Sequence, residues 1–179
     1  MLVLVVGPSG AGKDTLLDGA REHLRADPRF HFARRDITRP PTPGGEAHNP
    51  VDPATFAATR YALSWHAHGF SYGIRADIED ELAAGHVVVA SVSRGVIADA
   101  AVRYPVLVLE ITAPPEVLAS RLAARAREPE ADIAARLARN ISLPAGIAVE
   151  RVMNDGTIAA SVAKVVAVLS RAAESARPG

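Results

Sequence analysis

The sequence predicts an α/β fold built on a parallel sheet. Three observations favour this fold. Short runs of β-branched and aliphatic residues, typical of strands buried on both faces, recur along the chain. Segments with the residue spacing of amphipathic helices lie between these runs. The first apolar run also leads, through a short glycine-rich loop, directly into a segment with helical spacing.

The expected elements follow in chain order. The predicted strands are 2–6, 86–90 and 106–111, each bounded by Gly or Pro. The predicted helices are a segment after Lys13 with Leu16, Leu17, Ala20 and Leu24 on one face, then 78–83, 96–101, 115–139 and about 158–173. The segment 115–139 contains Glu128 and Pro129, which indicate two helices joined by a short turn.

The segment from about residue 30 to residue 73 departs from this alternation. It is rich in Pro and Gly, and its strand-like pieces, 30–34 and 61–65, are short. A segment of this kind is too short to fold alone. We therefore expect one domain over residues 1–179, with a core formed by 1–29 and 74–179 and a small inserted lobe at about 30–73.

The composition excludes several classes of function. The 20 basic and 20 acidic residues give a net charge of zero, which argues against bulk binding of nucleic acid or anionic membranes. The absence of cysteine excludes disulfides, iron–sulfur clusters and a thiol nucleophile. The apolar runs are too short or too interrupted for a signal peptide or a membrane span. We therefore expect a cytoplasmic protein that holds any anion with a local cluster of charges.

A phosphate-binding loop follows the first predicted strand. Residues 7–13 fit the pattern Gly-x-x-x-x-Gly-Lys between a strand and a helix, the P-loop context. Glycines allow positive φ, successive N–H groups surround a phosphate, and the next helix adds its positive end. A mobile lysine charge suits the β- and γ-phosphates. The predicted ATP-binding residues here are Gly7, Pro8, Ser9, Gly10, Ala11, Gly12, Lys13, Asp14 and Thr15.

Asp14 stands where the loop pattern has a Ser or Thr that binds Mg²⁺, and Thr15 comes one residue late. The strand 86–90 also ends without the carboxylate that usually supports this metal. We hypothesise that Asp14 reaches Mg²⁺ directly or through a water molecule, as a hard oxygen ligand can. The alternative is that Asp14 only favours the helix N-terminus through the helix dipole.

Polar clusters in and beside the insert predict a site for a phosphorylated acceptor. They lie at 34–39, 46–48, 64–73 and 91–95, the last at the end of a buried strand, where open α/β sheets bind ligands. Arginine forks bind phosphates, and hydroxyl and imidazole groups suit sugar hydroxyls. The alternative is that these polar side chains are ordinary surface residues without a ligand. The candidate acceptor-binding residues are Arg35, Thr38, Arg39, Glu46, His48, His66, Tyr72, Ser93 and Arg94.

The order of these motifs resembles the guanylate-kinase fold family across nearly the whole chain. Within it, the chain is most similar to the ribose 1,5-bisphosphate phosphokinases, in which an Asp after the loop lysine is usual. The stretches that carry this resemblance are 7–14, Asp-Ile-Thr-Arg at 36–39, Leu-Ser-Trp-His-Ala-His-Gly at 63–69, Ser-Arg at 93–94, Arg-Leu-Ala-Arg at 136–139 and Asn-Asp-Gly at 154–156.

Guanylate kinases themselves differ from this chain at the site that reads guanine. They have a carboxylate at the position of His66 and acidic residues in the segment that corresponds to 90–95, where this chain has none. The N–H donors of guanine need such acceptors, and each donor left unpaired costs about 1–3 kcal/mol. A sugar with two phosphates, which needs cations instead, suits the chain better.

The resemblance implies transfer of the γ-phosphoryl group of ATP, with Mg²⁺, to the 1-phosphate of ribose 1,5-bisphosphate. The product is 5-phosphoribosyl 1-diphosphate (PRPP), made in phosphonate catabolism. The resemblance also implies a lid at about 121–139 and places Asn154 near the adenine. The catalytic residues would be Lys13, Arg125, Arg127 and Arg136.

Several alternatives stay open at this stage. The chain could be a guanylate kinase or another nucleoside monophosphate kinase, or a non-catalytic guanylate-kinase-like binding module. The lid arginines could in part form a solvated helix face. The expected partner is a small sugar phosphate, with no nucleic acid and no membrane, and the oligomeric state is open, a homodimer included.

Overall fold

A five-stranded parallel sheet forms the centre of the computed structural model, which describes residues 1–40, 47–124 and 143–176. The strand order is β2-β7-β1-β8-β9, and every neighbouring pair is parallel. The α/β prediction is therefore confirmed. The three predicted strands are β1 (Leu2–Val6), β7 (Val87–Ser91) and β8 (Val106–Thr112), side by side in the middle of the sheet.

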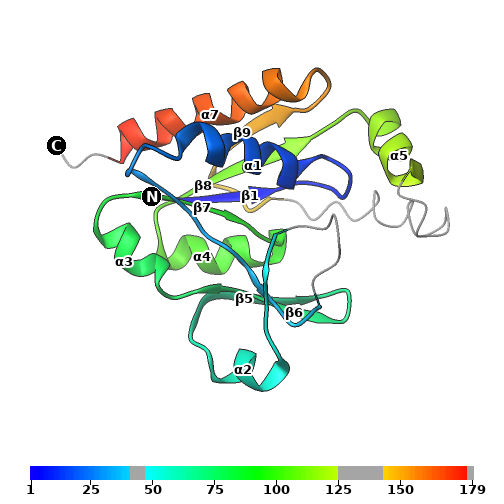
Figure 1. Cartoon of the computed structure of the whole chain (residues 1–179). Coiled ribbons are helices and arrows are strands. Elements are labelled where there is room, and N and C mark those ends of the chain that lie inside the picture. Colours follow the sequence, from blue (N-terminus) through cyan, green and yellow to red (C-terminus); the bar gives the residue numbers. More distant parts are fainter. Residues whose placement is uncertain (41–46, 125–142, 177–179) are drawn as a thin grey trace.

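Two helix layers cover the two faces of this sheet (Figure 1). One face packs against α1 (Lys13–Leu24) and α7 (Ile158–Ser175), and the other against α3 (Ile78–Ala83) and α4 (Ile97–Arg103), which the short helix η1 (Arg94–Val96) precedes. Side chains of β1 alternate between the faces, so that it is buried throughout and contributes to both cores. The helices predicted after Lys13 and near 78, 96 and 158 are all present.

Two strands were not recognised as parts of the large sheet. We expected Phe30–Phe32 in the inserted lobe, but these residues form β2 and pair with β7 at one edge. The lobe therefore begins after β2 rather than at residue 30. At the other edge, β9 (Ala148–Met153) pairs with β8, although no strand was predicted there. Both are edge strands, where half-exposed residues weaken the apolar pattern.

The inserted lobe is a second, four-stranded sheet on the α3–α4 side of the molecule (Figure 1). Its strands are β3 (Asp36–Ile37), β4 (Asn49–Pro50), β5 (Tyr61–Ala67) and β6 (Phe70–Arg75), with α2 (Pro53–Ala58) between β4 and β5. The strands β5 and β6 form an antiparallel hairpin that turns at His68 and Gly69, both with positive φ. The hairpin extends the strand predicted at 61–65.

A buried carboxylate holds the lobe together. Asp36 is fully buried and accepts hydrogen bonds from Asn49 Nδ2 at 3.0 Å, Tyr61 OH at 3.0 Å and Arg75 Nε at 2.8 Å. These donors come from the three other strands of the small sheet. Burial, followed by the hydrogen bond to Asp36, raises the pKa of Tyr61 to about 12. The lobe is thus organised around one charge rather than around a large apolar core.

The helix α5 (Pro115–Ala124) begins the segment predicted as a lid, next to the glycine-rich loop (Figure 1). The predicted break at Glu128 and Pro129 lies outside the described residues. Among the residues that are described, no helix has both the length and the apolar character needed to cross a membrane.

Candidate active site

The loop between β1 and α1 adopts a backbone that only glycine accepts easily. Gly12 has φ 84° at the start of α1, and a Cβ there would lie 2.6 Å from Asn154 Nδ2. A Cβ on Gly7, at φ 151°, would lie 1.9 Å from the carbonyl oxygen of Ile111. Both positions therefore require glycine for conformation and for space. The result is a tight loop at the positive end of a twelve-residue helix.

Lys13 is the first residue of α1, and its side chain folds back over the loop. Its Nζ donates to the carbonyl oxygens of Gly7 at 2.9 Å and Pro8 at 3.1 Å. These contacts keep the ammonium group within the curve of the loop, where the sequence predicts phosphate. Thr15, a further predicted ATP-binding residue on this helix, is exposed.

Two side chains from the far end of the chain contact the loop. Asn154, 4% exposed between β9 and α7, donates from Nδ2 to the carbonyl oxygen of Ala11 at 2.8 Å. Arg121 in α5 donates to the carbonyl oxygens of Gly10 at 3.4 Å and Asn154 at 3.5 Å. In the structure the amide of Asn154 contacts the loop backbone, and its predicted place near the adenine stays a prediction. Arg121 was not among the predicted site residues, although its spacing from Arg125 on one helix face is a usable signal.

Asp14 lies beside the predicted acceptor arginine Arg35. Arg35 Nη2 donates to Asp14 Oδ1 at 3.3 Å, with the Asp14 side chain half exposed. Both line a small cavity of about 30 Å³. Its other lining residues come from α1, β2, β7 and the segments that follow: Leu17, Asp18, Arg21, Phe32, Ala33, Arg34, Ala47, Val89 and Ser91. The structure therefore brings the predicted metal ligand and a predicted acceptor cation together.

Arg94 is the second predicted acceptor cation at the carboxyl edge of the large sheet, and it is ion-paired. Its Nη2 lies 2.7 Å from Glu110 Oε1, while Arg151 Nε lies 2.6 Å from Glu110 Oε2. Burial raises the pKa of Glu110, but the hydrogen bonds from Arg151 and Arg94 lower it further, and the net direction is down. Ser93, also predicted, accepts a hydrogen bond from Gly95 N and caps η1.

Sequence reasoning missed Glu110, although a usable signal was present. Glu110 is an acidic residue inside the otherwise apolar run 106–111, which the structure places in the sheet. Such a charge is rarely shielded from water without a partner. The group formed by Arg94, Glu110 and Arg151 therefore carries a net charge of one positive unit.

The other predicted acceptor residues lie along the small sheet. His66 Nε2 and Ser71 Oγ are 2.8 Å apart on the β5–β6 hairpin, and Thr38 Oγ1 accepts from Ser71 N at 2.9 Å. Tyr72 is 6% exposed and stacks on Trp65, with ring centroids 5.4 Å apart. Imidazole and hydroxyl groups therefore share one end of this hairpin.

Arg39 and His48 lie beside the same hairpin. The Arg39 guanidinium stands 5.9 Å from the centroid of the Phe70 ring, and His48 Nε2 is 3.0 Å from the Arg39 carbonyl oxygen. The remaining predictions for this region and for the lid lie outside the described residues: Glu46, Arg125, Arg127 and Arg136.

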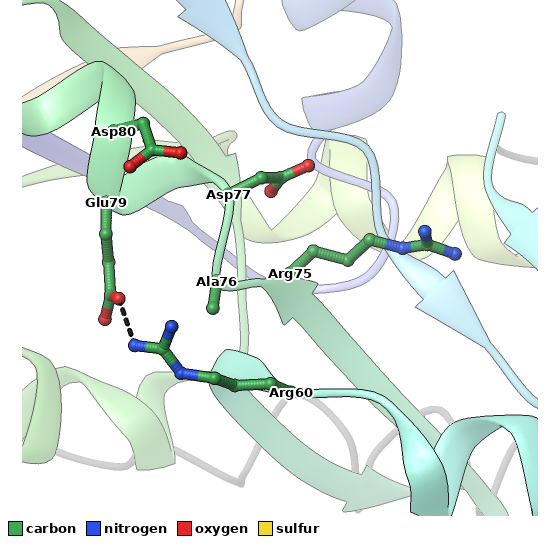
Figure 2. Close-up of a pocket in the computed structure, with 6 residues that line it drawn as sticks. All are labelled: Arg60, Arg75, Ala76, Asp77, Glu79 and Asp80. Carbon is green, nitrogen blue, oxygen red and sulfur yellow. Dashed lines mark hydrogen bonds and ion pairs between the residues drawn. The ribbon is translucent and has the colours of Figure 1, made fainter.

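A larger pocket of about 350 Å³ lies between the small sheet and α3, as Figure 2 shows. None of its lining residues belongs to the glycine-rich loop or to the small cavity beside Asp14. Its two arginines are paired with carboxylates, Arg60 with Glu79 and Arg75 with Asp36. No residue predicted for binding or catalysis lines it, and we assign it to the contact between lobe and core.

Comparison with solved structures shows which fold this protein has. Guanylate kinase from Anaplasma phagocytophilum matches with a TM-score of 0.67 at 16% identity, over 96% of this chain and 85% of that one. A sugar kinase from Janibacter matches with a TM-score of 0.54 at 18% identity, over 99% and 98% of the two chains. At such identities the similarity concerns the fold. The protein has the guanylate-kinase fold.

Curated sequences then identify the family. Ribose 1,5-bisphosphate phosphokinase PhnN of Acidiphilium cryptum is 51% identical over 95% of this chain and 92% of its own length. The proteins of the same name from Brucella melitensis and Methylobacterium radiotolerans are 50% and 49% identical over 89% and 94% of this chain, and 86% and 96% of their own length. The chain belongs to the ribose 1,5-bisphosphate phosphokinase family, which confirms the resemblance seen in the motifs. No family model matches the chain.

Proposed function

We propose that this protein transfers the γ-phosphoryl group of ATP, with Mg²⁺, to the 1-phosphate of ribose 1,5-bisphosphate. The products are PRPP and ADP, and the place of the reaction is phosphonate catabolism. The observation that carries the proposal is family membership at about half identity over nearly the whole chain, together with an intact strand–loop–helix and its Lys13. A binding module would have no need of this loop.

The glycine-rich loop would hold the β- and γ-phosphates of ATP. Lys13 Nζ now donates to two backbone carbonyls, which are neutral acceptors. A phosphate oxygen is a stronger, charged acceptor, so the ammonium group exchanges partners when nucleotide binds. Loop N–H groups and the start of α1 add to the attraction without any charge of their own.

The acceptor needs cations rather than a general base. The attacking group is a phosphate oxygen, which is already anionic, so catalysis depends on positioning and on neutralising charge. Arg35 lies beside the loop at Asp14, and Arg94 begins η1, the short helix that follows β7. These two arginines are our candidates for the acceptor phosphates, and His66 at the hairpin is our candidate for a sugar hydroxyl.

The same geometry disfavours guanine as the ligand of this site. A guanine base presents N–H donors that need carboxylate or carbonyl acceptors. Asp36 already accepts from three donors, and Glu110 pairs with two arginines. Where guanylate kinases have a carboxylate, this chain has His66, whose Nε2 lies within hydrogen-bond distance of Ser71 Oγ.

Asp14 is the candidate protein ligand of the divalent cation that accompanies ATP. A hard oxygen ligand at the start of α1 fits Mg²⁺, which is commonly bound by one or two carboxylates and the substrate phosphates. In the described ranges no group of three or more His, Cys, Asp or Glu could hold a metal without the nucleotide. When bound, Mg²⁺ would supply positive charge that offsets the negative charge of the ATP phosphates.

The lid arginines Arg125, Arg127 and Arg136 complete the proposal. Charge spreads over the oxygens of the transferring phosphoryl group, and arginines that close over them would stabilise it. Their neighbour Arg121 already reaches the loop backbone from α5. The cytoplasmic location and the absence of nucleic-acid and membrane partners stay predictions, as does a homodimer.

A panel of phosphoryl acceptors tests this proposal. Purified protein is incubated with ATP and Mg²⁺ and with ribose 1,5-bisphosphate, ribose 5-phosphate, GMP or AMP, and the release of ADP is measured. We expect turnover with ribose 1,5-bisphosphate and formation of PRPP, seen as a diphosphate by ³¹P NMR. Faster turnover with GMP would replace this proposal by a guanylate kinase. A Lys13→Ala variant controls for contaminating ATPase.

A further inference from the structure

Ser91 is a buried hydroxyl at the end of β7. The residue is 7% exposed, and its Oγ finds no hydrogen-bond partner within residues 1–40, 47–124 and 143–176. A buried polar group without a partner is rare in folded proteins, because it loses the hydrogen bonds that water would make. The Oγ of Ser91 is therefore available to a ligand or to a water molecule.

Ser91 faces the side of the sheet on which the phosphate loop lies. Val87 and Val89 pack in the core that α1 and α7 cover, and side chains alternate along a strand, so Ser91 shares their face. There it lines the cavity of about 30 Å³ together with Asp14 and Arg35. A cavity of roughly 10–15 Å³ is enough for one water molecule, so this cavity, which Ser91 and Asp14 both line, has room for a water.

The chemistry of these two positions is exchanged relative to the usual phosphate loop. In that arrangement a Ser or Thr after the loop lysine and an Asp on a neighbouring strand together hold Mg²⁺. Here the residue after Lys13 is a carboxylate, and the strand ends in a hydroxyl. The pair still provides one carboxylate and one hydroxyl, but on opposite elements.

We propose that Ser91 is the second protein group of the cation site. Its hydroxyl binds, through the water molecule that the cavity admits, the divalent cation held by Asp14 and by the phosphates of ATP. Ser91 is a positioning residue, since it acts on the metal through water. This inference rests on the proposed function, which brings ATP and Mg²⁺ to the loop.

Arg35 keeps Asp14 in place until the cation arrives. Its Nη2 contacts Asp14 Oδ1 only at 3.3 Å, and the Asp14 side chain is 49% exposed. Because this ion pair is long and partly solvated, a cation displaces it easily. Arg35 then contacts the acceptor phosphate, so that the metal and the acceptor meet at the same pair of residues.

An exchange of the two groups tests the proposal directly. The affinity for a non-hydrolysable ATP analogue is measured by calorimetry in EDTA and in Mn²⁺, and the ratio reports how strongly the protein holds the metal. The electron paramagnetic resonance spectrum of bound Mn²⁺ gives a second readout. The variants are Ser91→Ala, Asp14→Ser and the double variant Asp14→Ser/Ser91→Asp, which restores the usual arrangement.

We expect Ser91→Ala to lower the ratio about tenfold and to change the Mn²⁺ spectrum. Asp14→Ser should lower the ratio further, and the double variant should recover most of the loss. The matched control is Ser161→Ala, which removes another buried hydroxyl without a described partner, on α7 and outside the cavity. This control should leave the ratio unchanged, and thermal melting verifies that each variant folds.

Two different failures can be told apart. An unchanged ratio and spectrum in Ser91→Ala, or a double variant no better than Asp14→Ser, would overturn the role of Ser91 while ATP still binds. A wild-type protein that binds the analogue neither in EDTA nor in Mn²⁺ would overturn the proposed function, and this inference with it.

Discussion

The glycine-rich loop and the inserted lobe use their cations in different ways. In the loop, Lys13 and Arg121 donate to backbone carbonyl oxygens, which are neutral. In the lobe, Arg75 donates to a buried carboxylate, Asp36, that also accepts from two other strands. A hydrogen bond between two charged groups is stronger than one to a neutral carbonyl. Cations of the first kind can change partners when a phosphate arrives, and those of the second kind hold the fold.

The strongest test of this contrast is Lys13→Arg. A planar guanidinium on a longer side chain does not fit the curve of the loop as a compact ammonium group does. We expect kcat to fall by at least about a thousandfold, with an unchanged free energy of unfolding. The matched control is Lys164→Arg, because Lys164 is the other lysine of the chain and lies on exposed α7 surface. Turnover of Lys13→Arg near the wild-type rate would contradict our account of the loop.

For Asp36→Asn, in contrast, we expect a lower free energy of unfolding. This change removes the buried carboxylate that accepts from three donors, and because the Arg75 side chain is 46% exposed, we expect a loss of about 1–3 kcal/mol. Urea unfolding measures the loss. Asp18→Asn, at an exposed ion pair with Arg21, should change the free energy of unfolding by less than about 1 kcal/mol. If Asp36→Asn were as stable as the wild type, Asp36 would not organise the lobe.

The variant Asn154→Ala tests the support that the loop backbone receives from Asn154. It removes the amide that donates to Ala11 O, and an unpaired buried carbonyl costs about 1–3 kcal/mol. Because this carbonyl is part of the loop, we expect KM for ATP to rise about tenfold, with a smaller effect on KM for the acceptor. Steady-state kinetics with each substrate varied in turn measures the two values. Equal increases in both would show that Asn154 affects the fold in general.

The smallest expected effect concerns the pH dependence of stability. Interactions with Arg151 and Arg94 outweigh burial and lower the pKa of Glu110 below 4.5. A carboxyl with a lower pKa in the folded state adds stability above its unfolded pKa and loses it as the pH falls through the folded pKa. Wild type should therefore be more stable than Glu110→Gln by about 1–2 kcal/mol near pH 7. Urea unfolding at a series of pH values measures this difference, which should shrink as the pH falls below 4.5.

A pH-independent difference would mean that Glu110→Gln acts through packing. The control is Glu150→Gln on the exposed end of β9, where the ion pair with Arg171 lies in solvent. It should show no such pH dependence, because exposed ion pairs contribute little.

The sequence predicts the features of this molecule that depend on local pattern. The runs 2–6, 86–90 and 106–111 are continuous because both of their faces are buried, and the loop 7–13 has a fixed spacing. The strand β2 was predicted as a strand at 30–34 but assigned to the wrong sheet, and β9 was not predicted, because half-exposed edge strands need no apolar run. The contacts of Asp36 and Glu110 and the cavity that Ser91 lines were not predicted either, since each depends on which distant parts of the chain become neighbours. No local pattern contains that information.

The predicted site residues divide in the same way. The loop residues are together because they are consecutive. Asp14 and Arg35 meet across a separation of 21 residues, and Asn154 reaches Ala11 across 143. The sequence indicated the chemistry of these side chains but not that Asn154 contacts the loop or that Glu110 holds Arg94.

The hydrogen bond between Asn154 and Ala11 has a consequence for how the protein is made. A ribosome synthesises the loop first and Asn154 only after more than a hundred further residues. Until the segment after β9 is in place, the backbone of the loop lacks the hydrogen bond from Asn154 to Ala11. A nascent chain or a fragment that ends before β9 therefore lacks one support of its nucleotide site. Nucleotide binding therefore reports complete folding, and it can serve as a quality test for the variants away from the loop, such as Asp36→Asn and Glu110→Gln.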